Sequence, residues 1–262
     1  MNWEATAGSA SKRNLKAIII AAGMGNRLMP LTDGKPKCML DVNGKSIMQR
    51  QLEALRQCNI RDIIVVRGYK KEMITYPDIR YYENTDYENN NILRSLFYAE
   101  NELDDEFVFS YSDIIFEKSV LEKLLSSQED VSLVTDIDWL AHYQHRYQHP
   151  IPEAELVVVE DNRVIKIGKN IVKPEKAHGE FIGLVKFTKK GAEILRSTYE
   201  RITNRYRNRP FQQAASLEKA YLTDMIQELI DMGYSVSNVD ISGGWVEIDT
   251  SEDLEKAKGQ FK

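Results

Sequence analysis

The sequence predicts an α/β protein: a Rossmann-like, mixed and mostly parallel sheet flanked by helices, with a small additional lobe. Strand-like and helix-like segments alternate along much of the chain, which is the pattern of a sheet covered by helices. The 262 residues are enough to bury a sizeable core without disulfides or metals. The sequence contains neither an internal repeat nor a low-complexity linker, so residues 15–262 are expected to form a single domain.

The first half of the chain alternates most regularly. Short apolar runs bounded by turn residues predict strands, and apolar residues at helical spacing predict helices. The predicted strands are residues 16–22, 62–67, 80–83, 106–110 and 131–135. The predicted helices are residues 47–57, which follow an Asn-Gly turn, and residues 91–101 and 119–125.

The second half is less regular. An Asp-Asn turn at 161–162 predicts a hairpin between residues 154–160 and 163–167. The irregular stretch at about 135–180 is expected to form the small lobe, and the polar start, residues 1–14, is predicted to be a disordered leader. The remaining predicted strands are 181–187, 236–240 and 245–248, and the last two are expected to close the sheet. The remaining predicted helices are 190–205, 216–232 and 251–258, and the last is expected to be capped by Thr250 or Ser251.

Composition limits the partners of the protein. With 35 basic and 40 acidic side chains, the charge is balanced, and we expect neither nucleic acid nor an anionic membrane as a partner. No apolar run approaches the roughly 20 residues that span a bilayer. The two cysteines, Cys38 and Cys58, form neither a metal cluster nor a disulfide framework. These features predict a cytoplasmic protein, and they leave a homo-oligomer open.

A glycine loop follows the first predicted strand. The apolar run ends at Ala22, and Gly23 and Gly25 follow it. Glycine lets a phosphate approach backbone N–H groups closely, so these three residues are candidates for nucleotide binding. The spacing fits neither a P-loop nor a dinucleotide fingerprint, whose third glycine is replaced here by Leu28. A tight strand-to-helix turn is the alternative for the two glycines alone.

The longer pattern around this loop carries a resemblance. Gly-x-Gly-x-Arg-x-x-Pro-Leu-Thr-x-x-x-Pro-Lys, from Gly23 to Lys37, resembles the signature of the nucleotidyltransferases that activate sugar phosphates and small phosphorylated alcohols. The resemblance implies that Arg27 and Lys37 are catalytic and that they neutralise a nucleoside triphosphate.

Two aspartates are candidate metal ligands. Asp113 follows a predicted strand at the edge of the sheet where α/β proteins bind ligands, and Asp249 follows another. Each has an alternative: a surface turn for Asp113, and a helix cap for Asp249. The pattern Glu-Ile-Asp-Thr-x-Glu-Asp-Leu, residues 247–254, resembles the last motif of the nucleotidyltransferase family. On this resemblance the two aspartates share Mg²⁺, which prefers carboxylate, water and phosphate oxygens.

The segment 84–96 is expected to bind the base. Asn84, Asn91 and Ser95 supply paired donors and acceptors, and their spacing resembles the bacterial phosphocholine cytidylyltransferases. The glutamine and Pro-x-Gly turn of the hexose-phosphate enzymes are missing here. Cytidine is therefore favoured, with CTP as a substrate. The alternative is that the asparagines only cap a helix.

The acceptor is expected to bind near residues 135–150, where three histidines and an arginine gather. A zinc site at His142, His145 and His149, a solvated helix and an anion pocket are the three interpretations. The run around Asp138, Arg146 and His149, with Glu180 further on, resembles the cytidylyltransferases that act on 2-aminoethylphosphonate and related phosphonates. In that group a lysine of the following hairpin approaches the phosphoryl group. The resemblance implies that Lys169 has this role, and Lys166 is the alternative.

These features predict in-line transfer of CMP from CTP to a small phosphonate or phosphate monoester, preferably 2-aminoethylphosphonate, with Mg²⁺ as the cofactor and release of pyrophosphate. Phosphocholine and a sugar 1-phosphate are the alternative acceptors. A nucleotide-sensing subunit without catalysis is the remote alternative, since Arg27, Lys37 and Asp113 are all present.

Overall fold

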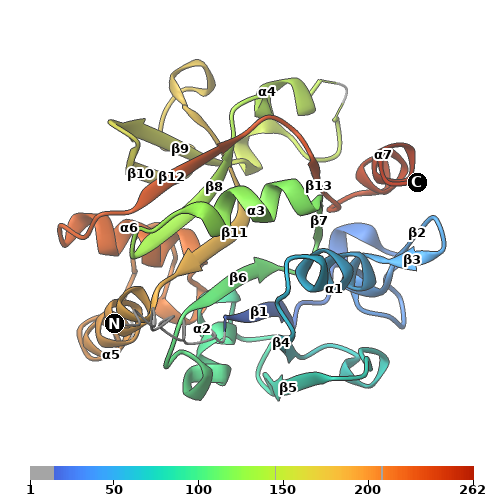
Figure 1. Cartoon of the computed structure of the whole chain (residues 1–262), viewed down its shortest axis with the longest axis horizontal. Helices are drawn as coiled ribbons and strands as arrows, with labels where there is room; N and C mark the ends of the chain where they lie inside the picture. Colours follow the sequence, from blue (N-terminus) through green and yellow to red (C-terminus); the bar gives the residue numbers. More distant parts are fainter. Residues whose placement is uncertain (1–14, 145, 208) are drawn as a thin grey trace, which may run out of the picture.

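A nine-stranded sheet forms the centre of the protein. The computed structural model describes residues 15–144, 146–207 and 209–262, so the leader predicted for residues 1–14 lies outside the described residues. The strands follow the order β5-β4-β1-β6-β11-β8-β12-β10-β9 across the sheet (Figure 1). They are β1 (Lys16–Ala21), β4 (Asp62–Arg67), β5 (Ile79–Glu83), β6 (Phe107–Tyr111), β8 (Val131–Asp136), β9 (Glu155–Glu160), β10 (Arg163–Lys169), β11 (Gly179–Phe187) and β12 (Ser237–Ile241).

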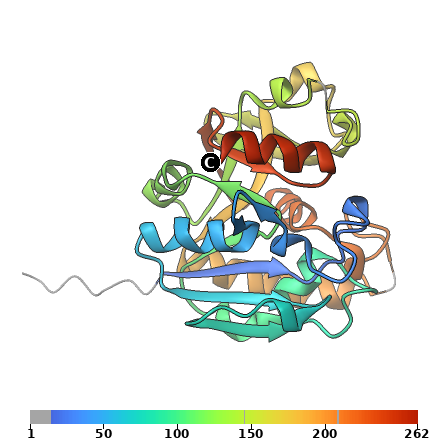
Figure 2. The same cartoon turned by 90° about the vertical axis from the view of Figure 1, so that its right-hand side faces the viewer.

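The sheet is mixed, as predicted, but the prediction that it is mostly parallel is wrong: four of its strand pairs are parallel and five are antiparallel. Strands β5, β4, β1 and β6 are parallel neighbours, and Figure 2 shows the blue to green arrows of this edge running side by side. Strand β11 is antiparallel to β6 and β8, and β10 is antiparallel to β9 and β12. Two short pairs lie outside the sheet: β2 (Asp41–Val42) with β3 (Lys45–Ser46), and β7 (Ile114–Phe116) with β13 (Trp245–Glu247).

Helices flank this sheet, which confirms the predicted α/β architecture. The α-helices are α1 (Ile47–Gln57), α2 (Ile92–Leu96), α3 (Lys118–Ser126), α4 (Trp139–His142), α5 (Lys189–Arg205), α6 (Leu222–Asp231) and α7 (Ser251–Gln260). Short 3₁₀ turns are η1 (Asn26–Leu28), η2 (Lys37–Met39), η3 (Lys71–Met73), η4 (Phe97–Glu102), η5 (Ile151–Glu153), η6 (Pro174–Lys176) and η7 (Leu217–Lys219). Within the described part of the chain, no helix has the length and apolarity needed to cross a bilayer.

Alternation along β1 divides the core between the two faces of the sheet. Ile18 and Ile20 belong to the cluster that contains residues of α5 and α6, while Ala17 and Ile19 belong to the cluster that contains residues of α1 and α3. Because successive side chains of a strand point to opposite faces, an unbroken apolar strand requires cover on both. The run of apolar residues in β1 is therefore explained by its central position.

Three predicted elements differ from the structure. The helix predicted at 91–101 ends at Leu96 and continues as η4, where Ala99 leaves helical geometry. The helix predicted at 216–232 is divided into η7 and α6, because the Asp224 carboxylate accepts from the backbone N–H of Tyr221 and starts a new helix there. The strand predicted at 245–248 does not close the main sheet; β13 pairs instead with β7, a three-residue strand too short to be recognised from the sequence.

The predicted lobe at about 135–180 is tied to the main sheet. Its hairpin, β9 and β10, lies at the edge of the nine-stranded sheet, and β9 also pairs with the start of β11. A small apolar cluster of Trp139, Tyr143, Ala154 and Leu156 packs the rest of this segment. The lobe therefore covers the carboxyl-terminal edge of the sheet, above the loops that follow β1 and β6.

Candidate functional site

A cavity of about 430 Å³ opens where β1 and β6 end. This is the edge of an α/β sheet at which ligands generally bind. Many of the residues predicted from the sequence line it: Gly23, Gly25, Arg27, Lys37, Asn91, Asp113, His149, Lys169, Glu180 and Asp249. The chain thus brings residues from its two ends and from the lobe to one place.

The glycine loop forms one wall of the cavity. Gly25 has φ of 65°, and a Cβ built on it would lie 3.0 Å from the Cβ of Lys37, so a larger residue would be strained and crowded. Gly23 has open space where a Cβ would be. Ala22 is buried behind the wall, and its carbonyl accepts from the backbone N–H of Tyr69 at 3.0 Å. Ala22 therefore fixes the loop from behind instead of lining the cavity.

Lys37 lies between the two predicted metal ligands. Its Nζ is 2.6 Å from Asp113 Oδ2 and 2.5 Å from Asp249 Oδ1. Burial lowers the pKa of Lys37, but the two carboxylates outweigh burial and raise this pKa above its ordinary value. The backbone N–H of Ile248 donates to the carbonyl of Asp113 at 2.9 Å, which joins the two aspartate segments. The side chain of Lys37 is thus a fixed positive charge between two carboxylates from distant parts of the sequence.

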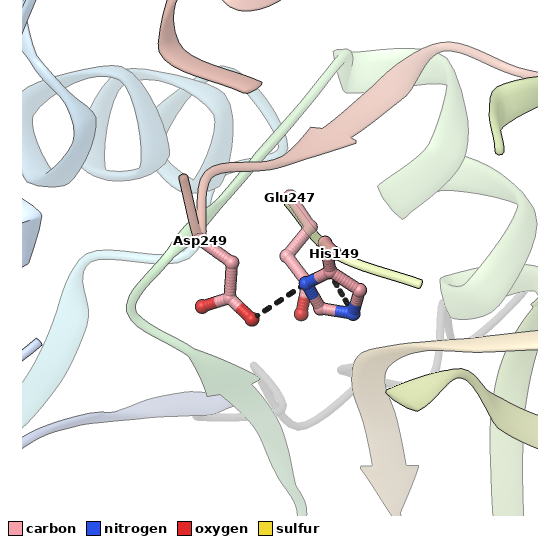
Figure 3. A group of neighbouring side chains, drawn as sticks. All are labelled: His149, Glu247 and Asp249. Carbon is pink, nitrogen blue, oxygen red and sulfur yellow. Dashed lines mark ion pairs between the residues drawn. The ribbon is translucent and has the colours of Figure 1, made fainter. Parts of the chain in front are cut away.

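Asp249 has two further neighbours, an arginine and a histidine. Arg27 Nη1 lies 2.9 Å from Asp249 Oδ2. His149 Nδ1 lies 3.0 Å from the same oxygen (Figure 3). Burial alone would raise the pKa of Asp249, but Lys37, His149 and Arg27 together hold this pKa well below its usual range. Asp249 therefore remains a carboxylate at any physiological pH, which a metal ligand requires.

The two aspartates fit a divalent cation. Asp113 Oδ1 is buried and has no hydrogen-bond partner among the described residues, although its other oxygen is paired with Lys37. A buried carboxylate oxygen without a partner is costly unless a ligand satisfies it. Hard oxygen donors of this kind suit Mg²⁺. These residues therefore fit the Mg²⁺ that the sequence leads us to expect.

The histidine site for zinc is not supported by the described residues. His142 is 3.1 Å from Asp136, and His145 lies outside the described residues. His149, Glu247 and Asp249 each offer a ligand atom within 4.8 Å of the others (Figure 3). Two arginines, however, contact this group, Arg27 at Asp249 and Arg146 at Glu247. These arginines, like Lys37 at Asp113 and Asp249, contact carboxylate oxygens that a bound metal ion would use, so cationic neighbours do not distinguish the two positions.

Glutamates gather at the lobe end of the cavity. Its lining includes Glu153, Glu155, Glu180 and Glu247, while Lys169 Nζ lies 2.9 Å from Glu153 Oε2. Burial raises the pKa of Glu155 to about 7, although Lys169 and hydrogen bonds from Thr223 and Tyr111 act in the opposite direction.

Glu180 has a similar environment. Burial, with repulsion from Glu247, raises the pKa of Glu180 to about 8, and Tyr143 Oη donates to its Oε1 at 2.5 Å. The lobe end of the cavity therefore combines one lysine with several acidic groups, two of which titrate near neutral pH. Such a surface can bind a ligand that carries both an anionic and a cationic group.

The predicted base-binding residues separate into two groups. Asn91 lines the cavity and caps α2, since its side chain accepts from the N–H of Ile92 at 2.9 Å. Asn84 and Ser95 are buried beside the cavity wall, where Asn84 Nδ2 donates to Ser95 Oγ at 2.9 Å and to Asn90 Oδ1 at 2.7 Å. Their side chains hold the loop before α2 in place and do not line the cavity.

Two predicted acceptor ligands point elsewhere. Arg146 makes a bidentate ion pair with Asp253 at 2.6 and 3.0 Å and contacts Glu247 at 2.9 Å, so it joins the lobe to α7 and β13. Asp138 accepts from the hydroxyl of Ser242 outside the cavity. The structure therefore gives both side chains contacts within the protein.

Several cavity residues were not singled out from the sequence. Glu153 and Glu155 are two residues apart near the start of β9, and Glu247 precedes Asp249 by two residues. Because residues two apart on an extended chain share a face, this spacing was a signal for Glu247 once Asp249 had been chosen. Tyr111, Tyr221 and Trp245 also line the cavity, and nothing in their local sequence distinguishes them from core aromatic residues.

Several known proteins are similar to this chain in sequence. A family model described as "MobA-like NTP transferase domain" matches residues 17–160. The CTP:phosphoglutamine cytidylyltransferase of Campylobacter jejuni is 31% identical over 254 residues, which cover 92% of this chain and 98% of that protein. A 2-aminoethylphosphonate cytidylyltransferase of Lancefieldella rimae is 38% identical over 106 residues, or 38% of this chain and 42% of that protein.

A solved structure shares the fold. The CTP:phosphocholine cytidylyltransferase of Streptococcus pneumoniae superposes with a TM-score of 0.72 and 24% identity, covering 95% of this chain and 99% of that one.

Proposed function

Because this chain belongs to the family of MobA-like NTP transferase domains, and is thus a nucleotidyltransferase, we propose that it transfers CMP from CTP to a small acceptor. The acceptor carries a phosphate or phosphonate group and an amine. The observation that carries this proposal is the convergence of Lys37, Arg27, Asp113 and Asp249 beside the glycine loop.

Transfer is proposed to proceed by direct displacement. An oxygen of the acceptor's phosphate or phosphonate forms a bond to the α-phosphorus of CTP. The bond from the α-phosphorus to the bridging oxygen breaks, and pyrophosphate leaves with that electron pair. The attacking oxygen is already anionic, so the protein needs no general base. Catalysis then depends on positioning and on charge neutralisation.

Each charged residue has a role in this scheme. Asp113 and Asp249 would hold Mg²⁺, which when bound supplies positive charge to the triphosphate. Lys37 and Arg27, both in contact with Asp249, neutralise charge on the phosphates. Lys169, at the lobe end of the cavity, neutralises the acceptor's phosphate or phosphonate.

The preference for CTP rests on two arguments. Asn91 lines the cavity at the start of α2, and the buried pair of Asn84 and Ser95 fixes the preceding loop, so the Asn91 amide is held beside the expected position of the base. In addition, a relative that matches 92% of this chain and 98% of its own length is named as a cytidylyltransferase.

The glutamates at the lobe end support an acceptor with an amine. An ammonium group beside Glu153, Glu155, Glu180 and Glu247 would favour the charged forms of these side chains, whereas the anionic group of a sugar phosphate would be repelled by them. 2-Aminoethylphosphonate and phosphorylated glutamine both combine an amino group with an anionic group. Phosphocholine is the second candidate, because Tyr221 and Trp245 line the same cavity and aromatic rings attract a quaternary ammonium group.

A pyrophosphate-release assay tests the proposal. The protein is incubated with Mg²⁺, each of the four NTPs in turn, and 2-aminoethylphosphonate, phosphoglutamine, phosphocholine or glucose 1-phosphate. We expect release with CTP and an amine-bearing acceptor, and a product whose mass is that of the acceptor plus CMP. Equal turnover of all four NTPs would refute the base assignment, and turnover of glucose 1-phosphate alone would refute the acceptor class.

A further inference from the structure

The side chain of Gln213 is bonded to the backbone of Lys169. The N–H of Lys169 donates to Gln213 Oε1 at 3.0 Å, and Gln213 Nε2 donates to the carbonyl of Lys169 at 2.7 Å. Gln213 does not itself line the main cavity, whereas Lys169 does. One amide thus satisfies both backbone groups of the residue proposed to meet the acceptor's phosphoryl group.

The amide takes the place of a neighbouring strand. Strand β10 pairs with β9 on one edge, but on the other edge its ladder to β12 is limited to the pairing of Arg163 with Ser237. Further along this edge, the N–H of Ile167 donates to Gln227 Oε1 at 2.9 Å, and Lys169 is bonded to Gln213. Two glutamine side chains therefore hold the end of β10 where no strand reaches it.

Gln213 is itself fixed. It lies in a tight turn whose ends, Phe211 and Ala214, exchange backbone hydrogen bonds of 3.0 and 2.9 Å, and the side chain of Phe211 is fully buried. The N–H of Gln213 donates to Asp224 Oδ1 at 2.9 Å. The other oxygen of Asp224 accepts from the N–H of Tyr221, whose ring lies 5.1 Å from Lys169 Nζ. The turn and the start of α6 thus hold Lys169 from two sides.

Gly168 leaves room for this arrangement. Its φ is 146°, and a Cβ built on it would lie 2.4 Å from Gln213 Oε1. Any other residue would push the amide away from the Lys169 peptide. The sequence therefore combines a glutamine that reaches the backbone with a glycine that permits the approach.

The direction of the Lys169 side chain follows from its peptide. Lys169 is opposite Glu155 in the ladder between β10 and β9, and directly opposed residues project to the same face of a sheet. Both side chains line the cavity, and Lys169 Nζ reaches Glu153. If the peptide rotated, the ammonium would leave this face.

We propose that Gln213 is a positioning residue for Lys169: its side-chain amide fixes the Lys169 peptide, and thereby holds the ammonium at the acceptor end of the cavity. The catalytic consequence rests on the proposed function, whereas the fixation of Lys169 does not. Gln213 acts through Lys169 and touches neither substrate.

The first test is a double-mutant cycle. Gln213→Leu removes both bonds, and Gln227→Leu is the matched control, because it removes the neighbouring bond to Ile167 and none to Lys169. We expect Q213L to lower kcat/KM for the acceptor by about 10- to 100-fold, the scale of a misplaced group, with the KM for CTP unchanged. Q227L should change kcat/KM for the acceptor less than about 3-fold. Adding Q213L to Lys169→Met should lower kcat/KM no further than Lys169→Met alone.

Two outcomes of the cycle would overturn the proposal. One is an equal loss in Q227L, which would mean that the hairpin end only needs stability. The other is a double variant, Q213L with Lys169→Met, whose fold-decrease in kcat/KM equals the product of the two single decreases. Gln213→Glu keeps an acceptor for the Lys169 N–H and places a carboxylate oxygen where the amide donates to the Lys169 carbonyl, so it serves as a second variant if Q213L folds poorly. Its kcat/KM should lie below that of wild type, and a wild-type value would contradict the role of the donor.

The second test needs no turnover. Lysine labelling by acetic anhydride, followed by peptide mass spectrometry, measures how tightly Lys169 is held. Its labelling rate should rise several-fold in Q213L and not in Q227L. An unchanged rate in Q213L would refute the positioning role. If the wild-type protein transfers no CMP but Lys169 is labelled faster in Q213L, the proposed function is refuted and the positioning of Lys169 by Gln213 still holds.

Discussion

Replacement of Lys37 by methionine tests the charge arrangement of the site. Lys37→Met keeps the aliphatic stem and removes the charge between Asp113 and Asp249. The side chains of these three residues are only 15%, 22% and 8% exposed, so the carboxylates would face each other with little screening by water. Removing one partner of a buried ion pair costs about 3–5 kcal/mol. Asp249 keeps Arg27 and His149, so we place the loss near the lower end, about 3 kcal/mol.

Urea and thermal unfolding without divalent metal provide the assay. A loss of about 3 kcal/mol corresponds to a decrease in Tm of roughly 6–12 °C for a protein of this size. Lys71→Met is the control: its ion pair with Glu83 has the same 2.6 Å length, but both side chains are more than 40% exposed. Such a pair contributes less than about 1 kcal/mol. Equal unfolding free energies for K37M and K71M would refute the reasoning.

The same comparison has a pH dependence with a fixed sign. In the folded wild type, the pKa of Asp249 lies below its unfolded value, which is near 4. The resulting stabilisation is fully present above pH about 4 and is lost as the pH falls toward the folded pKa. The difference in unfolding free energy between wild type and K37M should therefore narrow below pH about 4. A difference that grows in acid would contradict the assignment.

Three further predictions concern single residues. Asp113→Asn should lower kcat for pyrophosphate release by about 10²–10³, the scale of one electrostatic stabiliser, whereas Asp161→Asn in an exposed hairpin turn should leave it unchanged. Gly183→Ala should lower the unfolding free energy by about 1–3 kcal/mol, because φ is 82° and a Cβ would lie 2.4 Å from the Tyr111 ring; an unchanged urea midpoint would contradict this. Glu180 keeps its proton up to pH about 8 in the folded state, so the unfolding free energy should fall as the pH rises from 5 to 8. Glu180→Gln should make this dependence on pH weaker. If urea unfolding gives the same dependence for both proteins, the raised pKa is refuted.

The sequence was sufficient to predict the architecture and the centre of the site. The resemblance to nucleotidyltransferases rested on a long motif, and the family match confirms it. Asp113 follows β6 of the main sheet, whereas Asp249 follows β13, which pairs with β7 outside that sheet. The proximity of the two aspartates, which both contact Lys37, was therefore predicted by the family resemblance and not by the topology.

Side-chain partners far apart in sequence could not be predicted. An arginine is a common anion ligand, so Arg146 was predicted to bind the acceptor. Its ion pair with Asp253 forms because the lobe packs on α7, and this packing is not visible in the sequence. Trp245 begins a strand whose partner has three residues, so periodicity could not identify the pairing. Asn84 forms its hydrogen bonds inside a loop, and a buried amide satisfied by neighbours has the same sequence signature as one that binds a base. These roles depend on tertiary contacts, which a single sequence does not specify.

We propose that Asp113 and Asp249 jointly hold the metal of a bound triphosphate. Anomalous diffraction from crystals grown with Mn²⁺ and a non-hydrolysable CTP analogue locates that metal. We expect one anomalous peak within coordination distance of both carboxylates, with the α-phosphate beside it and Lys37 moved from between the two acids or shared with the phosphates. A peak that contacts neither aspartate, with the nucleotide bound away from the glycine loop, would contradict it.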